Sequence, residues 1–211
     1  MKENNVLNTG TTTIGLVGKE CIVLAADKRA TAGNFIAHKK VDKIFPINDR
    51  MALTTAGVVS DIQLLIKLLK AELKLKSIRV EREPSVKEAA NLLTNIIYSN
   101  VRKLSMIPGI THFLLGGMDK ELKLYDLYAD GSITEVDDFV ASGSGSVIAY
   151  GTLEANYKKD LSEAEGVELA IKGVNAAMQR DSASGEGIDV YVINKSGVRK
   201  AAHKKVSTKA E

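Results

Sequence analysis

Near its start the chain reads Gly10-Thr11-Thr12-Thr13-Ile14-Gly15-Leu16-Val17, and this segment bears on both the fold and the chemistry of the protein. Threonine is β-branched, so a threonine triplet before Ile14 and Leu16 predicts the beginning of a β-strand. A chemical interpretation depends on the bond between Gly10 and Thr11. If that bond is cut, Thr11 carries a hydroxyl group and a free α-amine within reach of each other, which is one way to activate a weak nucleophile. By itself, the triplet favours the strand alone.

Short strands are expected in the first part of the chain. Residues 11–17 and 21–26 are rich in β-branched and apolar side chains, and they flank the turn Gly18-Lys19-Glu20. Ala32-Gly33-Asn34 is a further break, and residues 51–55 complete this block of strands.

Two helices are expected after the strands. The first has two apolar stripes at helical spacing on nearly opposite faces. One stripe can cover a sheet, and the other then needs another helix or a partner chain. This pattern favours a layered protein that forms oligomers, although a wholly internal arrangement also fits. The stripes comprise Ile62, Ile66, Leu69 and Leu73 on one face and Leu64, Leu68, Ala71 and Leu75 on the other.

The second helix begins with a capping-box pattern, Ser85-Val86-Lys87-Glu88, directly after Pro84. Pro108-Gly109 is expected to end it. Its wide apolar face is expected to comprise Val86, Ala90, Leu93, Ile97, Val101 and Leu104.

Strands and helices alternate in blocks over the remaining chain. The serine–glycine segment 142–146 leads into a short helix, and a second capping box, Ser162-Glu163-Ala164-Glu165, begins another. Further strands are expected at residues 111–116, 122–128, 132–136, 187–194 and 198–202. This order predicts one α+β domain with helices layered on sheets.

The composition is that of an ordinary soluble domain, with 45% hydrophobic and 26% charged residues. The net charge of +3 is too small to argue for nucleic acid, and Cys21 has no second cysteine with which to form an internal disulfide. The start of the chain lacks the apolar core of a secretory signal, and no apolar run reaches the roughly 18–20 residues of a membrane span. We therefore expect a cytoplasmic protein that binds neither nucleic acid nor membranes.

No metal or cofactor is expected. The three histidines, His38, His112 and His203, are scattered and have no cysteine or carboxylate cluster nearby in the sequence.

A nucleophilic Thr11 needs further groups. A free α-amine has a pKa of about 7.7–8.0, which suits proton transfer at neutral pH. A nearby cation would keep that amine neutral and help the hydroxyl to ionise, and a carboxylate must hold the cation. Lys43 and Asp27 are candidates, although either could be a solvated surface charge. The N–H of Gly57 at a strand end could stabilise an oxyanion, or Gly57 could simply mark a turn.

Six segments in order closely resemble the proteasome β subunits, which are threonine proteases with an N-terminal nucleophile. The resemblance runs from Gly10 to about Val192 without a large gap, and the archaeal type is the most similar. Any one segment is a weak indication of the family, whereas six segments in order at matching spacings are a specific one. The segments are Thr11–Gly15, Ala26–Thr31, His38–Ile44, Thr55–Gly57, Gly143–Ser146 and Gln179–Gly185.

The resemblance implies a fold and a set of roles. The fold is the four-layer αββα sandwich of N-terminal-nucleophile hydrolases. Thr11 is the nucleophile, Lys43 lowers the pKa of its hydroxyl, and Asp27 orients Lys43. Gly57 stabilises the oxyanion. The residues that surround Thr11 and hold its amine and an ordered water are Ser144, Asp181 and Ser184.

The resemblance also implies processing and a substrate. Residues 1–10 are a propeptide removed by autocleavage between Gly10 and Thr11, and residues 11–211 are a single catalytic domain. An unfolded polypeptide binds as an added strand. Thr55 stands where strongly apolar-preferring members have methionine or isoleucine. None of the expected substrate-binding positions is charged, which predicts apolar or neutral residues before the cut; these positions are Ala30, Thr31, Val41, Phe45, Thr55, Gly57, Val59 and Gln63.

The implied partners are other β subunits in seven-membered rings, flanking rings of α subunits and a regulatory ATPase that acts through the α rings. One alternative is a structural β subunit of a mixed ring that is unprocessed or inactive. Another is the simpler bacterial two-ring threonine peptidase or an amidase with an N-terminal nucleophile, against which the Asp181–Gly185 segment argues. An α subunit is excluded, because α subunits lack the exposed threonine and carry an N-terminal gating helix.

Overall fold

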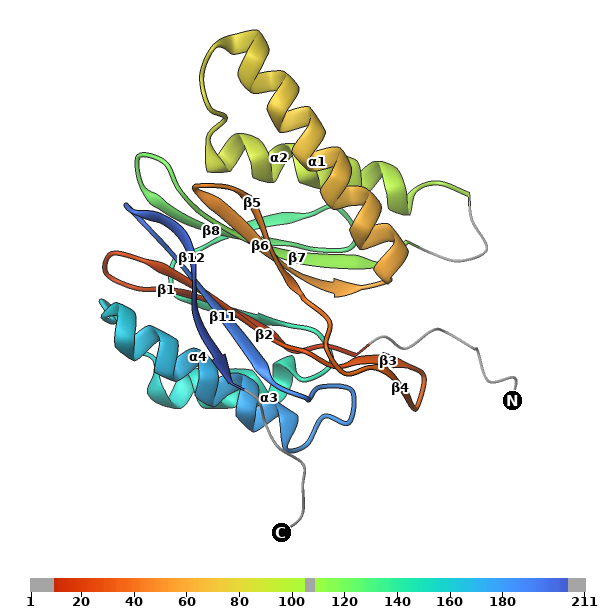
Figure 1. Cartoon of the computed structure of the whole chain (residues 1–211), viewed down its shortest axis with the longest axis vertical. Coiled ribbons are helices and arrows are strands. Elements are labelled where there is room, and N and C mark those ends of the chain that lie inside the picture. Colours follow the sequence, from red (N-terminus) through yellow and green to blue (C-terminus); the bar gives the residue numbers. More distant parts are fainter. Residues whose placement is uncertain (1–9, 105–108, 205–211) are drawn as a thin grey trace.

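Two five-stranded antiparallel sheets lie face to face in the computed structural model, with a pair of helices on the outer side of each (Figure 1). The structure describes residues 10–104 and 109–204. The layers follow each other as helices, sheet, sheet and helices, so the expected α+β class and the αββα sandwich are confirmed.

The first sheet carries the N-terminal strand between β10 and β2, and helices α3 (Ser146–Asn156) and α4 (Glu163–Met178) cover this sheet. Its strand order is β10-β1-β2-β11-β12. These strands are β10 (Phe139–Ser142), β1 (Thr13–Val17), β2 (Ile22–Asp27), β11 (Ile188–Asn194) and β12 (Gly197–Lys204).

The second sheet is covered by α1 (Val59–Val80) and α2 (Val86–Val101), and its strand order is β5-β6-β7-β8-β9. These strands are β5 (Ile44–Asn48), β6 (Met51–Gly57), β7 (Thr111–Met118), β8 (Leu122–Leu127) and β9 (Ile133–Val136). A separate two-stranded hairpin comprises β3 (Ala30–Ala32) and β4 (Phe35–His38).

Period-two alternation explains how one strand serves two hydrophobic cores. In β2, Val23 and Ala25 pack toward α3 and α4, whereas Ile22 and Leu24 pack into the core between the sheets. A third core lies between the second sheet and its helices. Asp27 ends β2, so the catalytic candidate stands on the most deeply buried strand of the molecule.

Both predicted capping boxes are present. Ser85 accepts from the N–H of Glu88 at 3.2 Å, and the Glu88 carboxylate accepts from the N–H of Ser85 at 2.8 Å. Ser162 and Glu165 make the same reciprocal pair at the start of α4. These caps satisfy N–H groups that have no partner within the helix.

The end of α2 was predicted too late. The helix ends at Val101, the N–H of Lys103 bonds to the carbonyl of Asn100 in a tighter turn, and Leu104 is fully exposed instead of facing the core. Pro108, the expected terminator, lies outside the described residues. Strand β5 lies within the expected block of short strands but was not given bounds of its own, because Pro46 breaks its sequence pattern, and the short strand β10 was not predicted.

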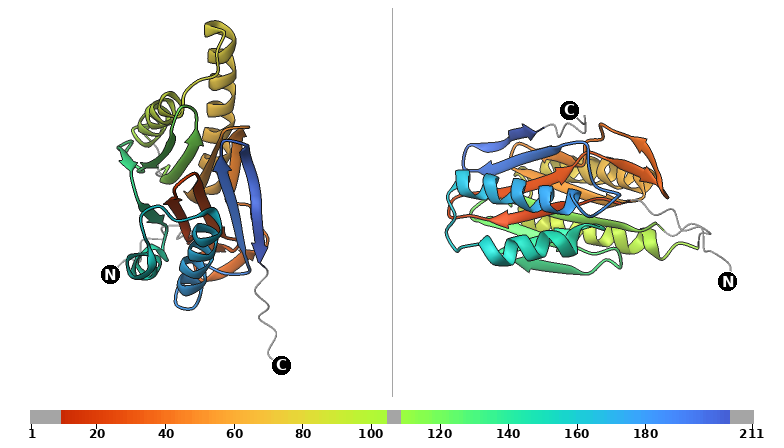
Figure 2. Two further views of the ribbon diagram at one scale, coloured as in Figure 1. Left: turned by 90° about the vertical axis from the view of Figure 1, so that its left-hand side faces the viewer. Right: turned by 90° about the horizontal axis from the view of Figure 1, so that it is seen from below.

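The two apolar stripes of α1 have different environments. Ile62, Ile66, Leu69 and Leu73 are buried against the second sheet, as one stripe was expected to be. The opposite stripe remains exposed at Leu64, Leu68 and Leu75. The C-terminal part of α1 extends past the sheets (Figure 2). Within residues 10–104 and 109–204, no helix has both the length and the apolar character that crossing a bilayer requires.

Candidate active site

Thr11 lies just before β1 and is buried, with 5% of its surface exposed. Its N–H donates to Ser144 Oγ at 3.2 Å. Its hydroxyl donates to the carbonyl oxygen of Gly10 at 2.7 Å, so the candidate nucleophile lies directly beside the peptide bond that precedes it. The structure therefore brings Gly10, Thr11 and Ser144 together as the sequence predicted.

Asp27 and Lys43 form a buried ion pair. Lys43 Nζ donates to Asp27 Oδ1 at 2.7 Å, and the two side chains are 6% and 0% exposed. Three backbone N–H groups, those of Thr12, Arg29 and Gly185, also donate to the Asp27 carboxylate, each at 3.0 Å. These four bonds fix the orientation of the carboxylate and supply the hydrogen-bond partners that a buried polar group needs.

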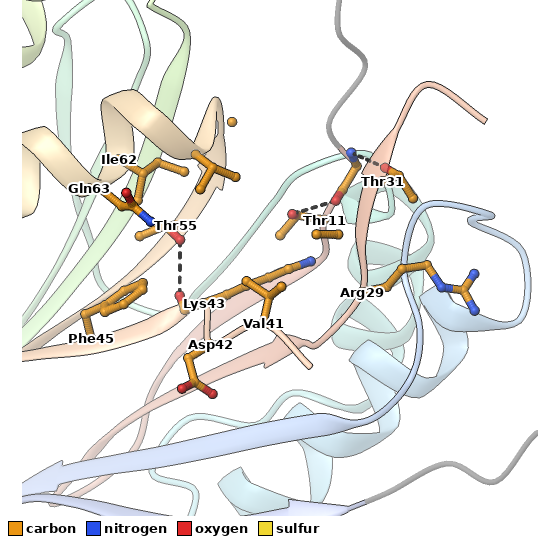
Figure 3. A pocket seen from close by; sticks show the side chains of 14 residues that line it. Thr11, Arg29, Thr31, Val41, Asp42, Lys43, Phe45, Thr55, Ile62 and Gln63 are labelled. Atoms are coloured by element: carbon orange, nitrogen blue, oxygen red, sulfur yellow. Dashed lines mark hydrogen bonds between the residues drawn. The ribbon is translucent and has the colours of Figure 1, made fainter. Parts of the chain in front are cut away.

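The ammonium group of Lys43 points toward Thr11 (Figure 3). Burial lowers the pKa of Lys43 below its ordinary value, and the charge and hydrogen bond of Asp27 oppose that effect. A cation in this position favours the neutral form of an amine at Thr11 and the ionised form of the hydroxyl.

Asp181 organises the serines around Thr11. Its Oδ2 accepts from Ser144 Oγ and from Ser184 Oγ, both at 2.6 Å. Ser144 in turn contacts Thr11, whereas Ser184 bonds to the hydroxyl of Thr12 at 2.7 Å. Ser184 thus reaches the nucleophile only through its neighbour and through Asp181.

Two glycines of the site occupy positions that require glycine. Gly143 has a φ of +91°, and a Cβ there would lie 2.0 Å from the carbonyl oxygen of Thr11. Gly57 has a φ of +124°, and a Cβ there would lie 2.2 Å from the carbonyl oxygen of Ile110. Because Gly143 lies so close to Thr11, the serine–glycine segment 142–146 is a tight turn against Thr11 and not a linker.

A small cavity of about 90 Å³ opens beside Thr11 (Figure 3). Every predicted substrate-binding residue lines it. Three charged residues, Arg29, Asp42 and Lys43, line the cavity in addition to these positions. The guanidinium of Arg29 is directed to the carbonyl of Ser182 and the carboxylate of Glu186. The predicted lining residues are Ala30, Thr31, Val41, Phe45, Thr55, Gly57, Val59 and Gln63.

Sequence reasoning missed two polar connections behind the site. Lys28 pairs with Asp42 and with the buried Asp189, although residues 27–29 resemble a solvated turn in the sequence. His112 contacts Ser142, just before the Gly143 turn, with its Nδ1 2.7 Å from the serine oxygen. Its other nitrogen bonds to Asp126. Ser142 lies on β10 of the first sheet and His112 and Asp126 lie on β7 and β8 of the second, so this serine–histidine–aspartate chain links the two sheets.

A helix-covered pair of sheets, with a threonine leading a central strand beside a buried lysine–aspartate pair, defines the class of N-terminal-nucleophile hydrolases. A family model described as "Proteasome subunit" matches residues 7–193. The chain belongs to this family and is a β-type subunit of the proteasome core, which assembles with other subunits.

The sequence relatives agree with this membership. A "Proteasome subunit beta" of Ferroglobus placidus is 51% identical over 185 residues, which are 87% of this chain and 86% of the relative. A "Proteasome subunit beta" of Archaeoglobus profundus is 49% identical over 89% of this chain and 86% of its own. A "Proteasome subunit beta 2" of Ignicoccus hospitalis is 47% identical over 90% and 87%.

Proposed function

We propose that this subunit is a threonine-type endopeptidase that exposes its own nucleophile by cutting the chain after Gly10. The observation that carries the proposal is the buried Asp27–Lys43 pair, whose ammonium group points toward Thr11. Position 11 offers a hydroxyl group, and Ser144 Oγ accepts from the N–H of the same residue while donating to Asp181.

Self-cleavage begins when Thr11 Oγ attacks the carbonyl carbon of Gly10. The C–N bond breaks as the ester forms, the acyl group moves from nitrogen to oxygen, and the nitrogen takes up the hydroxyl proton. Water then hydrolyses the ester, which releases residues 1–10 with a carboxyl end and leaves Thr11 with a free amine. Of the leader, only Gly10 belongs to the described residues, and its N–H is held by Thr31 Oγ1 at 3.2 Å.

Peptide cleavage uses the same atoms. The Thr11 amine accepts the hydroxyl proton while Oγ attacks the substrate carbonyl, and the Gly57 N–H stabilises the oxyanion that forms. The leaving amine takes the proton, and water hydrolyses the acyl ester. Lys43 stabilises the developing alkoxide, Asp27 fixes Lys43, and Asp181 holds Ser144 and Ser184 in place around the amine.

The substrate is an unfolded polypeptide in the cytoplasm. It binds as an extended strand between the segments at Thr31 and Gly57, and main-chain hydrogen bonds make selection loose. The small cavity selects the residue before the cut. Apolar lining from Val41, Phe45 and Val59 favours apolar or neutral side chains there.

The assembly consists of seven-membered β rings between α rings, with a regulatory ATPase that delivers unfolded chains through the α rings. The exposed apolar stripe of α1 supports contacts with neighbouring subunits, because a monomer in water gains nothing from leaving leucines uncovered.

The test is the intact mass of the subunit after co-expression with α subunits. Wild type should lose residues 1–10 and cleave a fluorogenic peptide, whereas Thr11→Ala should do neither unless a neighbour removes its leader. Lys43→Ala should lower kcat by about 10²–10⁴. Lys39→Ala, at an exposed lysine of the same segment, is the matched control. Assembled particles that keep the leader and lack activity would instead support a structural, unprocessed β subunit.

A further inference from the structure

Two ion pairs of opposite polarity join the same two segments of the chain, residues 27–28 and residues 42–43. Lys43 donates to Asp27, and Lys28 donates to Asp42, with a distance of 2.7 Å in each pair. Figure 3 shows the adjacent side chains of Asp42 and Lys43 pointing in different directions, Lys43 toward Thr11 and Asp42 away from it. The second pair therefore lies outside the reacting centre but on the segment that carries Lys43.

Lys28 is anchored in the first sheet. Its Nζ donates to Asp189 Oδ2 on β11 at 2.6 Å, and the two side chains are 10% and 5% exposed. The other carboxylate oxygen of Asp189 faces Lys200 and His203 on β12, at 2.8 and 2.6 Å. One end of this network is thus fixed to paired strands, and the other end is Asp42.

Residues 40–43 depend on such contacts because they belong to no strand. They connect β4 to β5. The N–H of Val41 donates to the carbonyl of Lys28 at 3.0 Å, and the N–H of Thr55 donates to the carbonyl of Lys43 at 2.9 Å. The side chain of Asp42, between Val41 and Lys43, is 72% exposed. Its restraint is the ion pair with the ammonium group of Lys28.

We propose that Lys28 is a positioning residue for peptide cleavage: through Asp42 it holds the segment that keeps the Lys43 ammonium directed at Thr11. This inference rests on the proposed function and adds a residue to it. When Lys28 loses its charge, the Asp42 carboxylate turns to water, and the segment keeps only one of its two side-chain ties to residues 27–28, the Lys43–Asp27 pair. A small displacement of a catalytic group is enough to slow a reaction by one or two orders of magnitude.

The experiment compares Lys28→Met with Lys200→Met in particles assembled with α subunits, using a fluorogenic peptide with leucine before the cut. Both lysines bond to Asp189, but only Lys28 bonds to Asp42. We expect Lys28→Met to lower kcat about tenfold with KM within twofold of wild type, while Lys200→Met keeps wild-type kcat. Equal losses in both variants, or full activity of Lys28→Met, would overturn the inference.

Asp42→Asn gives a second measurement that leaves Lys28 and its bond to Asp189 in place. This substitution at an exposed side chain should lower kcat by a similar factor. The variant that carries both substitutions should be no slower than Lys28→Met alone, because both changes break the same ion pair. Losses of kcat that add in the double variant, or an Asp42→Asn variant with wild-type kcat, would contradict the inference about Lys28. An inactive wild-type particle would instead refute the proposed function, so the two failures are distinguishable.

Discussion

At the scale of single residues, Asp27 has a structural role as well as its proposed chemical role. Its carboxylate accepts from Lys43 and from three backbone N–H groups that come from separate segments of the chain. A buried polar group is costly when it loses a partner, so this set of bonds ties the start of β1, the end of β2 and the turn at Gly185 to one carboxylate. The geometry needed for chemistry is therefore maintained by the same contacts that hold the local fold together.

Gly10 also has no room for a side chain. A Cβ at this position would lie 1.7 Å from the Cβ of Ala183. Gly10→Ala should therefore displace the scissile bond and slow the loss of residues 1–10, measured by the intact mass of particles sampled over time. Adding Ala183→Gly removes the obstructing methyl group and should restore much of the rate. Equal processing in wild type and Gly10→Ala would disprove this steric account.

The lone cysteine provides a pH-dependent prediction. Burial, with a smaller effect of the nearby Glu163, raises the pKa of the Cys21 thiol to about 11. Because the thiol stays protonated below that pH, iodoacetamide should label the folded protein far more slowly at pH 8 than the guanidinium-unfolded chain. Labelling of the folded protein should accelerate as the pH rises toward 11. Fast labelling at pH 8 would mean that Cys21 is accessible and not buried.

At the scale of elements, helix beginnings were easier to predict than helix ends. Ser85 with Glu88 and Ser162 with Glu165 marked two starts correctly, since a capping box is a local pattern of side chain and backbone. The apolar spacing of α2 continues to Leu104 in the sequence, but the helix has already ended at Val101. Periodicity shows which face is apolar and contains no stop signal of its own.

Two glycines of α3, Gly151 within the helix and Gly145 at its N-cap, have opposite requirements. Gly151 lies in the exposed interior of the helix with no atom within 4 Å of an added Cβ, whereas a Cβ at Gly145 would lie 2.0 Å from Thr12 Oγ1. Gly151→Ala should stabilise the subunit by about 1 kcal/mol, because alanine is the better helix former. Gly145→Ala should destabilise it, and thermal unfolding of the two variants should shift in opposite directions. Shifts of the same sign would be inconsistent with this structure.

Site residues were predictable to different degrees. Thr11, Asp27 and Lys43 stand in segments whose resemblance to a family is strong, and the structure places them together. Lys28 and Asp42 were not predicted, because their partners lie on distant segments and charged residues in a turn are usually solvated. Only the pairing of β2 with β11 reveals that Lys28 meets a buried carboxylate.

At the scale of the whole molecule, three hydrophobic cores account for the four layers. The outer stripe of α1 is an exposed apolar surface, where Leu64, Leu68 and Leu75 are 47%, 41% and 45% exposed. The sequence predicted this second stripe but could not identify its partner, because the surface that would pack against the stripe is not part of this chain's local pattern. Proteasome subunits assemble, so we expect a neighbouring subunit to cover the stripe.

Leu68→Lys should therefore reduce the yield of assembled particles when α and β subunits are co-expressed, while the unassembled subunit stays folded. Lys67→Glu, at an adjacent exposed polar position of the same helix, should assemble normally. Size-exclusion chromatography with native mass spectrometry measures both. Wild-type assembly of Leu68→Lys would indicate that this stripe faces solvent in the particle.

The cavity wall itself contains Gly10, the residue after which we propose that the chain is cut. While the bond to Thr11 is intact, Gly10 forms part of the wall and the Thr11 nitrogen belongs to a peptide bond. The proposed cleavage would therefore clear this side of the groove and create the reactive amine in the same event, as when an enzyme sheds a covalently attached inhibitor.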